Sequence, residues 1–313
     1  MHPWNEPLLE SFRSRLARLP HALLIHGAHG TGKLALAERI AQLLLCESSA
    51  QRPCDRCEGC RWFLAGSHPD FRRVEPEILM KEPAVEDEDA PREKKSKAPS
   101  IVIKIEQIRE LTDFLNIRSH RGARRVTILH PAEDLFPNAA NALLKALEEP
   151  PGSAMFILVS HQPAKLLPTI RSRCVGLPVP IPPAAVASQW LKEQGVTDAQ
   201  RWLAYAGGAP LAAIQYAEQA DTIDRLLRNP SPVDERENLP RLVEAMQKKA
   251  IDRAMAAFGL PPKYGTATSN PGRAAAREWL AIAREMGENR ALSTHPVNAR
   301  LFSAALLSRL EKP

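Results

Sequence analysis

The sequence predicts an α/β fold, in which a mostly parallel β-sheet carries helices on both faces and purely helical domains follow. Short apolar runs alternate with stretches of helical periodicity in the first half of the chain, a pattern typical of parallel sheets that are buried on both sides. Strand-like runs stop after residue 183. The two halves are joined by the proline-rich segment 177–183 (LPVPIPP), which we expect to be stiff and extended.

The first predicted elements enclose a glycine-rich turn. An amphipathic helix is expected over 5–18, a short buried strand over 22–26 and another helix over 34–45. A strand, a glycine-rich loop and a helix in this order commonly open a parallel α/β unit. The later elements of this half are a helix over 105–115, buried strands over 125–129 and 155–160, and a helix over 139–147 that ends before Pro150.

The length of 313 residues indicates two or three domains. We expect an α/β domain over 1–178 with a cysteine-rich module at 46–60, a small helical domain over 179–221 and a C-terminal helical domain over 222–313. The stretch 77–99 combines an acidic run, a basic run and prolines, which indicates a solvated loop or insert.

Composition and charge limit the function classes only loosely. The net charge of +6 permits work near nucleic acid without demanding it. The first residues do not resemble a secretory leader, and no apolar run is long enough to cross a bilayer, so we expect a cytoplasmic protein without a membrane partner. Thiols stay reduced in the cytoplasm, so the five cysteines are better interpreted as metal ligands or packed thiols than as disulfides.

The glycine-rich turn has the spacing of a phosphate-binding P-loop, with Gly27, Gly30, Gly32 and Lys33 in place. Glycines let backbone N–H groups surround a phosphate, and the lysine adds a positive charge. The next position normally holds a Ser or Thr whose hydroxyl binds Mg²⁺, and here it is Leu34. The turn is therefore either a phosphate cradle without its metal ligand or a P-loop retained as a structural turn.

A second position that would normally bind Mg²⁺ is also altered. The strand 125–129 ends in His130 and Pro131, where a P-loop ATPase carries acidic residues that hold Mg²⁺ and orient water. Glu133 and Asp134 lie farther along, and we do not assign them a catalytic role. We expect no ATP hydrolysis by the chain alone and weak or no binding of Mg-ATP.

Four cysteines predict a structural zinc site. Cys54, Cys57 and Cys60 are separated by two residues each, and Cys46 precedes them at the end of the helix 34–45. Four soft sulfurs suit tetrahedral Zn²⁺ and leave no open position for a substrate. An iron–sulfur cluster would place its fourth cysteine just downstream before a proline, which this sequence lacks. Packed, unliganded thiols are the remaining alternative.

Arg173 lies in a short segment, Ser172-Arg173-Cys174, at the end of a predicted helix. An arginine at the edge of a domain can reach the γ-phosphate of a neighbour's nucleotide and stabilise charge in the transition state. Taken alone, an exposed arginine is more often a solvated residue or a salt-bridge partner, so the assignment depends on its context.

The order of these segments resembles the bacterial clamp-loader AAA+ subunits. The resemblance is carried by the P-loop remnant, the CxxCxxC insert, SHPDF at 67–71, NALLKALEEPP at 141–151 and SRC at 172–174. It covers about residues 1–215 and continues more weakly into the C-terminal helices, around 298–301. It implies a P-loop-type parallel sheet, a helical lid and an all-α collar domain.

Within the family, four positions depart from the pattern of the ATP-hydrolysing motor subunit, called gamma or tau. These departures favour the degenerate, non-hydrolysing kind of subunit. Leu34, His130 and Pro131 are three of them, and Pro210 stands where the motor has a lid arginine. The resemblance implies a five-membered ring with gamma/tau and delta subunits that loads a sliding clamp onto primed DNA as part of the DNA polymerase III holoenzyme. It also implies that Arg173 acts in trans, as an arginine finger, on a neighbouring ATP site.

Two alternatives to this interpretation remain. The chain could be an active motor ATPase with an unusual Mg²⁺ shell, although Leu34 and His130 count against it. It could also be a zinc-dependent nucleic-acid-binding protein, but aromatic residues make up only 5% and no stacking platform stands out.

Overall fold

The computed structural model describes residues 1–49, 52–80, 99–117, 124–265 and 272–310. The chain divides into two compact units, Met1–Ile181 and Pro182–Pro313. Most of the predicted insert 77–99 lies outside the described residues.

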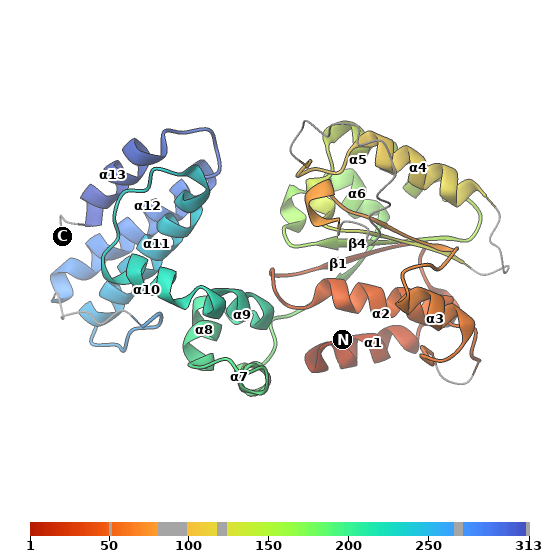
Figure 1. The fold of residues 1–313 in the computed structure, drawn as a ribbon, viewed down its shortest axis with the longest axis horizontal. Helices are drawn as coiled ribbons and strands as arrows, with labels where there is room; N and C mark the ends of the chain where they lie inside the picture. Colours follow the sequence, from red (N-terminus) through yellow and green to blue (C-terminus); the bar gives the residue numbers. More distant parts are fainter. Residues whose placement is uncertain (50–51, 81–98, 118–123, 266–271, 311–313) are drawn as a thin grey trace, which may run out of the picture. The chain divides into compact units, whose positions relative to one another are not determined.

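Unit 1 is built on a sheet that includes β1 and β4 (Figure 1). The sheet has five strands, whose pairs are all parallel, in the order β2-β3-β4-β1-β5. The strands are β1 (Ala22–His26), β2 (Phe71–Val74), β3 (Arg125–Leu129), β4 (Ala154–Ser160) and β5 (Val175–Pro178). The three predicted strands are confirmed, and they form the centre of the sheet. The two strands that the sequence did not reveal, β2 and β5, are its short edges.

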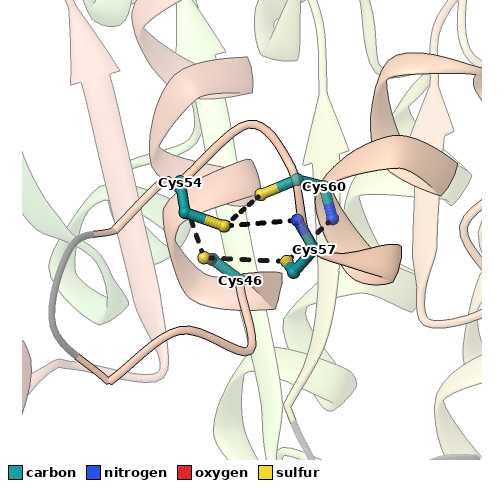
Figure 2. Close-up of side chains that lie close together, drawn as sticks. All are labelled: Cys46, Cys54, Cys57 and Cys60. Carbon is teal, nitrogen blue, oxygen red and sulfur yellow. Dashed lines mark hydrogen bonds between the residues drawn. The ribbon is translucent and has the colours of Figure 1, made fainter.

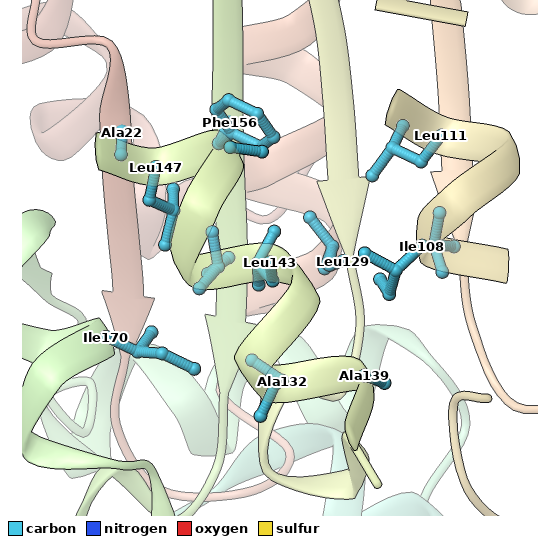
Figure 3. Packing of buried hydrophobic residues seen from close by; sticks show 14 of the residues in the cluster. Ala22, Ile108, Leu111, Leu129, Ala132, Ala139, Leu143, Leu147, Phe156 and Ile170 are labelled. Carbon is cyan, nitrogen blue, oxygen red and sulfur yellow. The ribbon is translucent and has the colours of Figure 1, made fainter. Parts of the chain in front are cut away.

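Helices cover both faces of the sheet, as the sequence predicted. The helices of unit 1 are α1 (Glu6–Arg13), α2 (Lys33–Leu45), α3 (Glu58–Leu64), α4 (Ile105–Asn116), α5 (Pro137–Glu148) and α6 (Pro168–Arg173). Successive residues of β1 pack into different cores: Ala22 lies in the cluster with α4, α5 and α6 (Figure 3), and Leu23 in the cluster with α1 and α2. Burial on both faces explains why the central strands are continuously apolar.

Unit 2 is helical throughout its described residues, as predicted. Its helices are α7 (Ala184–Glu193), α8 (Ala199–Tyr205), α9 (Pro210–Glu218), α10 (Ala220–Arg228), α11 (Leu239–Ala257), α12 (Ala276–Leu292) and α13 (Ala299–Leu310). One apolar core joins α7, α8 and α9 with Ile223 and Leu227 of α10 and Ala245 of α11. This core therefore extends across residue 221, and the further division of unit 2 into two domains stays a prediction. None of the described helices is long and apolar enough to span a membrane.

A buried lysine ties α8, α9 and α11 together. The ammonium of Lys248 lies 3.2 Å from the centroid of the Tyr205 ring and 4.8 Å from that of Tyr216. Its Nζ donates to the Glu244 carboxylate at 2.9 Å, and the Tyr216 hydroxyl donates to the same carboxylate at 3.0 Å. Lys248 is 7% exposed and Glu244 9% exposed, so each charge is balanced inside the core rather than by water.

We expect Lys248→Ala to destabilise unit 2 by about 3–5 kcal/mol, because it leaves Glu244 buried without its closest cation. Arg290 also lies 3.4 Å from Glu244 and offsets part of this loss. The measurement is the urea midpoint of unfolding, with Lys192→Ala, on the exposed face of α7, as the matched control. A midpoint equal to that of the control would contradict a stabilising role for the Lys248 pair.

Candidate functional site

The four predicted cysteine ligands come together at one point (Figure 2). Cys46 directly follows α2, Cys54 lies in the loop, Cys57 caps the N-terminus of α3, and Cys60 is in its first turn. Their sulfur atoms all lie within 4.8 Å of one another. The spacing that the sequence offered is therefore matched by convergence of the four thiols in space.

The sulfur geometry fits a tetrahedral ion. The Sγ atoms of Cys46 and Cys57 are 3.9 Å apart, and those of Cys54 and Cys60 are 4.0 Å apart. Two sulfurs bound at about 2.3 Å to one tetrahedral ion would be about 3.8 Å apart, whereas a disulfide needs about 2.0 Å. Three backbone N–H groups, those of Cys54, Cys57 and Cys60, each donate to a neighbouring sulfur at 3.4 Å. Such donors favour the thiolate form that metals bind.

The P-loop keeps its shape around Lys33. Gly27 has a φ of 153°, and a Cβ there would lie 2.3 Å from the carbonyl oxygen of Val179, so only glycine allows this close approach. Gly32, with a φ of 79°, caps the start of α2. Lys33 is only 2% exposed, its ammonium donates to the Ala28 carbonyl, and burial lowers its pKa to about 8.

The N-terminal residues fasten this loop from outside. The Trp4 indole donates to the Thr31 carbonyl at 2.9 Å, and the Asn5 amide donates to the carbonyls of Thr31 and Gly32 at 3.1 and 3.2 Å. The ring of His2 lies so close that a Cβ on Gly32 would be 2.4 Å from it. The side chains of the N-terminal segment therefore hold the P-loop in its observed conformation.

Neither position for a Mg²⁺ ligand carries one. Leu34 packs against the core on the α2 side of the sheet. His130 follows β3, and its Nε2 lies 3.2 Å from Nε2 of His161, which follows β4. Burial, first among the causes, lowers the pKa of His130 to about 4 and that of His161 to about 3. Both imidazoles are therefore neutral near pH 7. His130 and Pro131 stand where an ATPase carries its acidic pair.

Sequence reasoning missed His161 and the role of Glu133. One carboxylate oxygen of Glu133 accepts backbone hydrogen bonds from His161 at 2.9 Å and Gln162 at 3.1 Å. Glu133 thus secures the turn after β4, and its charge also acts on Lys33. No sequence spacing connects these residues, because they meet only through the pairing of β3 with β4.

Arg173 is the last residue of α6. Its guanidinium donates to the Thr169 carbonyl at 2.9 Å and forms an ion pair with Glu148, the last residue of α5. The Arg173 side chain is 33% exposed and that of Glu148 is 50% exposed. The predicted arginine finger thus lies at the surface of unit 1. Its guanidinium points back to Thr169 of the same helix, α6.

Comparison with known proteins places this architecture in a family. Residues 4–182 match the family described as DNA polymerase III, delta subunit. The chain belongs to this DNA polymerase III subunit family. The sequence is 39% identical to the delta' subunit of Pseudomonas aeruginosa over 68% of this chain and 60% of that protein. It is 33% identical to the delta' subunit of Escherichia coli, with the same coverage.

The matched region spans about 60% of the length of these delta' relatives. Among solved structures, a gamma subunit-related protein of DNA polymerase III from Thermotoga maritima aligns over 97% of this chain and 99% of its own, at 20% identity and a TM-score of 0.49. A RuvB mutant from the same organism aligns over 82% of this chain and 80% of its own, at 15% identity and a TM-score of 0.40. The predicted relationship to DNA polymerase III subunits is confirmed by the family match over residues 4–182.

Proposed function

We propose that this delta' family member is a non-catalytic, stator-like subunit of the DNA polymerase III clamp loader. The observation that carries this proposal is the loss of both Mg²⁺ positions within a preserved P-loop fold: Leu34 is packed into the core, and His130 ends β3. A P-loop enzyme depends on its metal to neutralise developing charge. The chain therefore contributes structure to the loader rather than ATP turnover.

Arg173 is the residue through which the chain acts on a neighbour's ATP. Both side chains of its ion pair with Glu148 are partly exposed. Such exposed pairs contribute only about 0–1 kcal/mol to stability. A triphosphate carries more negative charge than one carboxylate and can replace it at little cost. Arg173 then serves as an arginine finger in trans, at the ATP site of a gamma/tau subunit.

The cysteine cluster holds one structural Zn²⁺. Cys46, Cys54, Cys57 and Cys60 provide four thiolates and close the coordination shell. The ion would fasten the loop between α2 and α3 to the sheet domain, and it supplies no Lewis-acid chemistry to a substrate.

The proposed compartment and partner subunits are inferred from the family. The chain works in the cytoplasm within a five-membered ring of gamma/tau, delta and this subunit, which loads a sliding clamp onto primed DNA. Residues 179–221 act as the lid and 222–313 as the collar domain that holds the ring together.

Reconstitution tests the proposal. Purified chain is mixed with gamma/tau and delta subunits, and ATP turnover is measured with and without clamp and primed DNA. We expect the chain alone to be inactive and clamp- and DNA-stimulated turnover to require its presence. Turnover by the isolated chain that is lost in Lys33→Ala would instead identify a motor ATPase.

A further inference from the structure

Three neighbouring strands direct histidines to the same edge of the sheet. His130 follows β3, His161 follows β4, and His29 lies in the turn after β1. The strand order β3-β4-β1 places these three ends side by side, and parallel strands present their carboxyl ends at one edge. The proposed stator function gives these imidazoles no task.

The two inner imidazoles are spaced as ligands of one ion. Their Nε2 atoms are 3.2 Å apart, and the ring planes cross at 84°. Two nitrogens bound at about 2.0 Å to a tetrahedral ion would be about 3.3 Å apart. Without an ion, this contact is a single hydrogen bond, and the Nδ1 atoms of His130 and His161 are both buried with no hydrogen-bond partner among the described residues.

The donor chemistry selects the ion. Magnesium requires oxygen ligands, whereas neutral imidazole suits zinc and its first-row neighbours. Glu133 lies beside the pair through its bonds to the turn after β4, and its second carboxylate oxygen is buried without a partner in the described chain. The negative charge of Glu133 offsets the positive charge of Lys33. The Lys33 ammonium itself is directed to the Ala28 carbonyl.

His29 is available as a third ligand. Its ring centroid lies 4.8 Å from that of His161, and the residue is exposed, so the side chain can turn. In the described chain, the cysteine cluster is the one group whose three or more donor atoms already converge within 4.8 Å. His29 therefore joins the site only when an ion draws it in.

We propose that the carboxyl edge of the sheet beside the P-loop is a second metal site, which binds one zinc-type transition ion through Nε2 of His130 and Nε2 of His161. His29 completes the protein ligands, and water fills the remaining position. The ion would connect β3, β4 and the P-loop.

Zinc content of the purified full-length chain tests this site. After equilibrium dialysis against micromolar free Zn²⁺, we expect two ions per chain, one of which is lost in His130→Gln and in His161→Gln. Calorimetry should give affinities for the second ion that are roughly 100-fold weaker in these variants and less affected in His29→Gln. His295→Gln, an exposed histidine of unit 2, is the matched control.

Two outcomes would overturn the proposal. The first is a single zinc per wild-type chain, a result that does not depend on how well the variants fold. The second is a second zinc that persists in the His130 and His161 double variant, which would indicate a surface site. Co²⁺ substitution separates the centres, because only the cysteine site gives sulfur-to-metal charge-transfer bands.

Discussion

An Arg173→Ala chain is expected to assemble into the clamp loader but to lower ATP turnover at the interface that it serves by about 10³-fold or more. Arginine fingers stabilise charge that develops on the transferred phosphoryl group, so their loss acts on the transition state more than on assembly. The side chain is 33% exposed and bonds to the Thr169 carbonyl and the Glu148 carboxylate at the surface of its unit, so its removal should leave the fold intact.

The weak ion pair with Glu148 is compatible with the proposed second partner of Arg173, a neighbour's triphosphate. In the isolated chain, the carboxylate holds the guanidinium against the C-terminal end of α5. The exposed pair contributes at most about 1 kcal/mol, whereas an arginine finger contributes several kcal/mol to a transition state. The exchange of Glu148 for a triphosphate is therefore favourable only when a neighbour presents its nucleotide.

Single-turnover ATP hydrolysis by the reconstituted loader measures the effect of Arg173→Ala. If the other interfaces of the proposed ring keep arginines of their own, the loss should appear as a missing fraction of the fast phase. Arg171→Ala is the control, since Arg171 is exposed on the same short helix. Unchanged rates in the Arg173 variant, with assembly intact, would remove the finger assignment.

The central part of the fold was predictable from sequence, because β1, β3 and β4 are buried on both faces and are therefore apolar throughout. The edge strands were not predictable. β2 has only four residues and carries exposed Arg72 and Arg73, so it lacks the apolar pattern by which a central strand is recognised.

The cysteine and histidine sites also differ in how far the sequence predicts them. The cysteines are close in sequence, and their two-residue spacing is itself a geometric signal. The histidines are not: His130 and His161 are 31 residues apart and become neighbours only because β3 pairs with β4. Glu133 was visible as an acidic residue, but only the structure reveals that its carboxylate binds the backbone after β4.

Removal of zinc, by chelation or by Cys54→Ser with Cys57→Ser, is expected to unfold the segment 46–64 while the sheet of unit 1 stays folded. The side-chain contacts of its described residues with the rest of the unit include Asp55 with Arg39 and Gln42 near the surface, and Phe63 with Phe71. Binding of a structural zinc contributes about 10 kcal/mol or more in small modules, far more than an exposed ion pair.

The sheet should survive because the buried residues of its two cores lie outside the segment 46–64, from whose described residues the partly buried Phe63 packs against one core. The central strands are buried between α1 and α2 on one face and α4, α5 and α6 on the other. Hydrogen exchange measured by mass spectrometry checks this prediction: α3 should lose its protection after chelation, and β4 should keep it. Cys174→Ser is the control, since Cys174 lies outside the four-thiol cluster and should leave the zinc of that cluster in place.

Protection of α3 that persists after zinc is removed would contradict a structural role for the ion. The packing of Phe63 on Phe71 would then be sufficient to hold the module. Global unfolding would contradict the predicted independence of the sheet, since it would mean that the end of α2 at Cys46 transmits the loss into the core. Local loss of protection is the one result that fits a metal acting on its own loop.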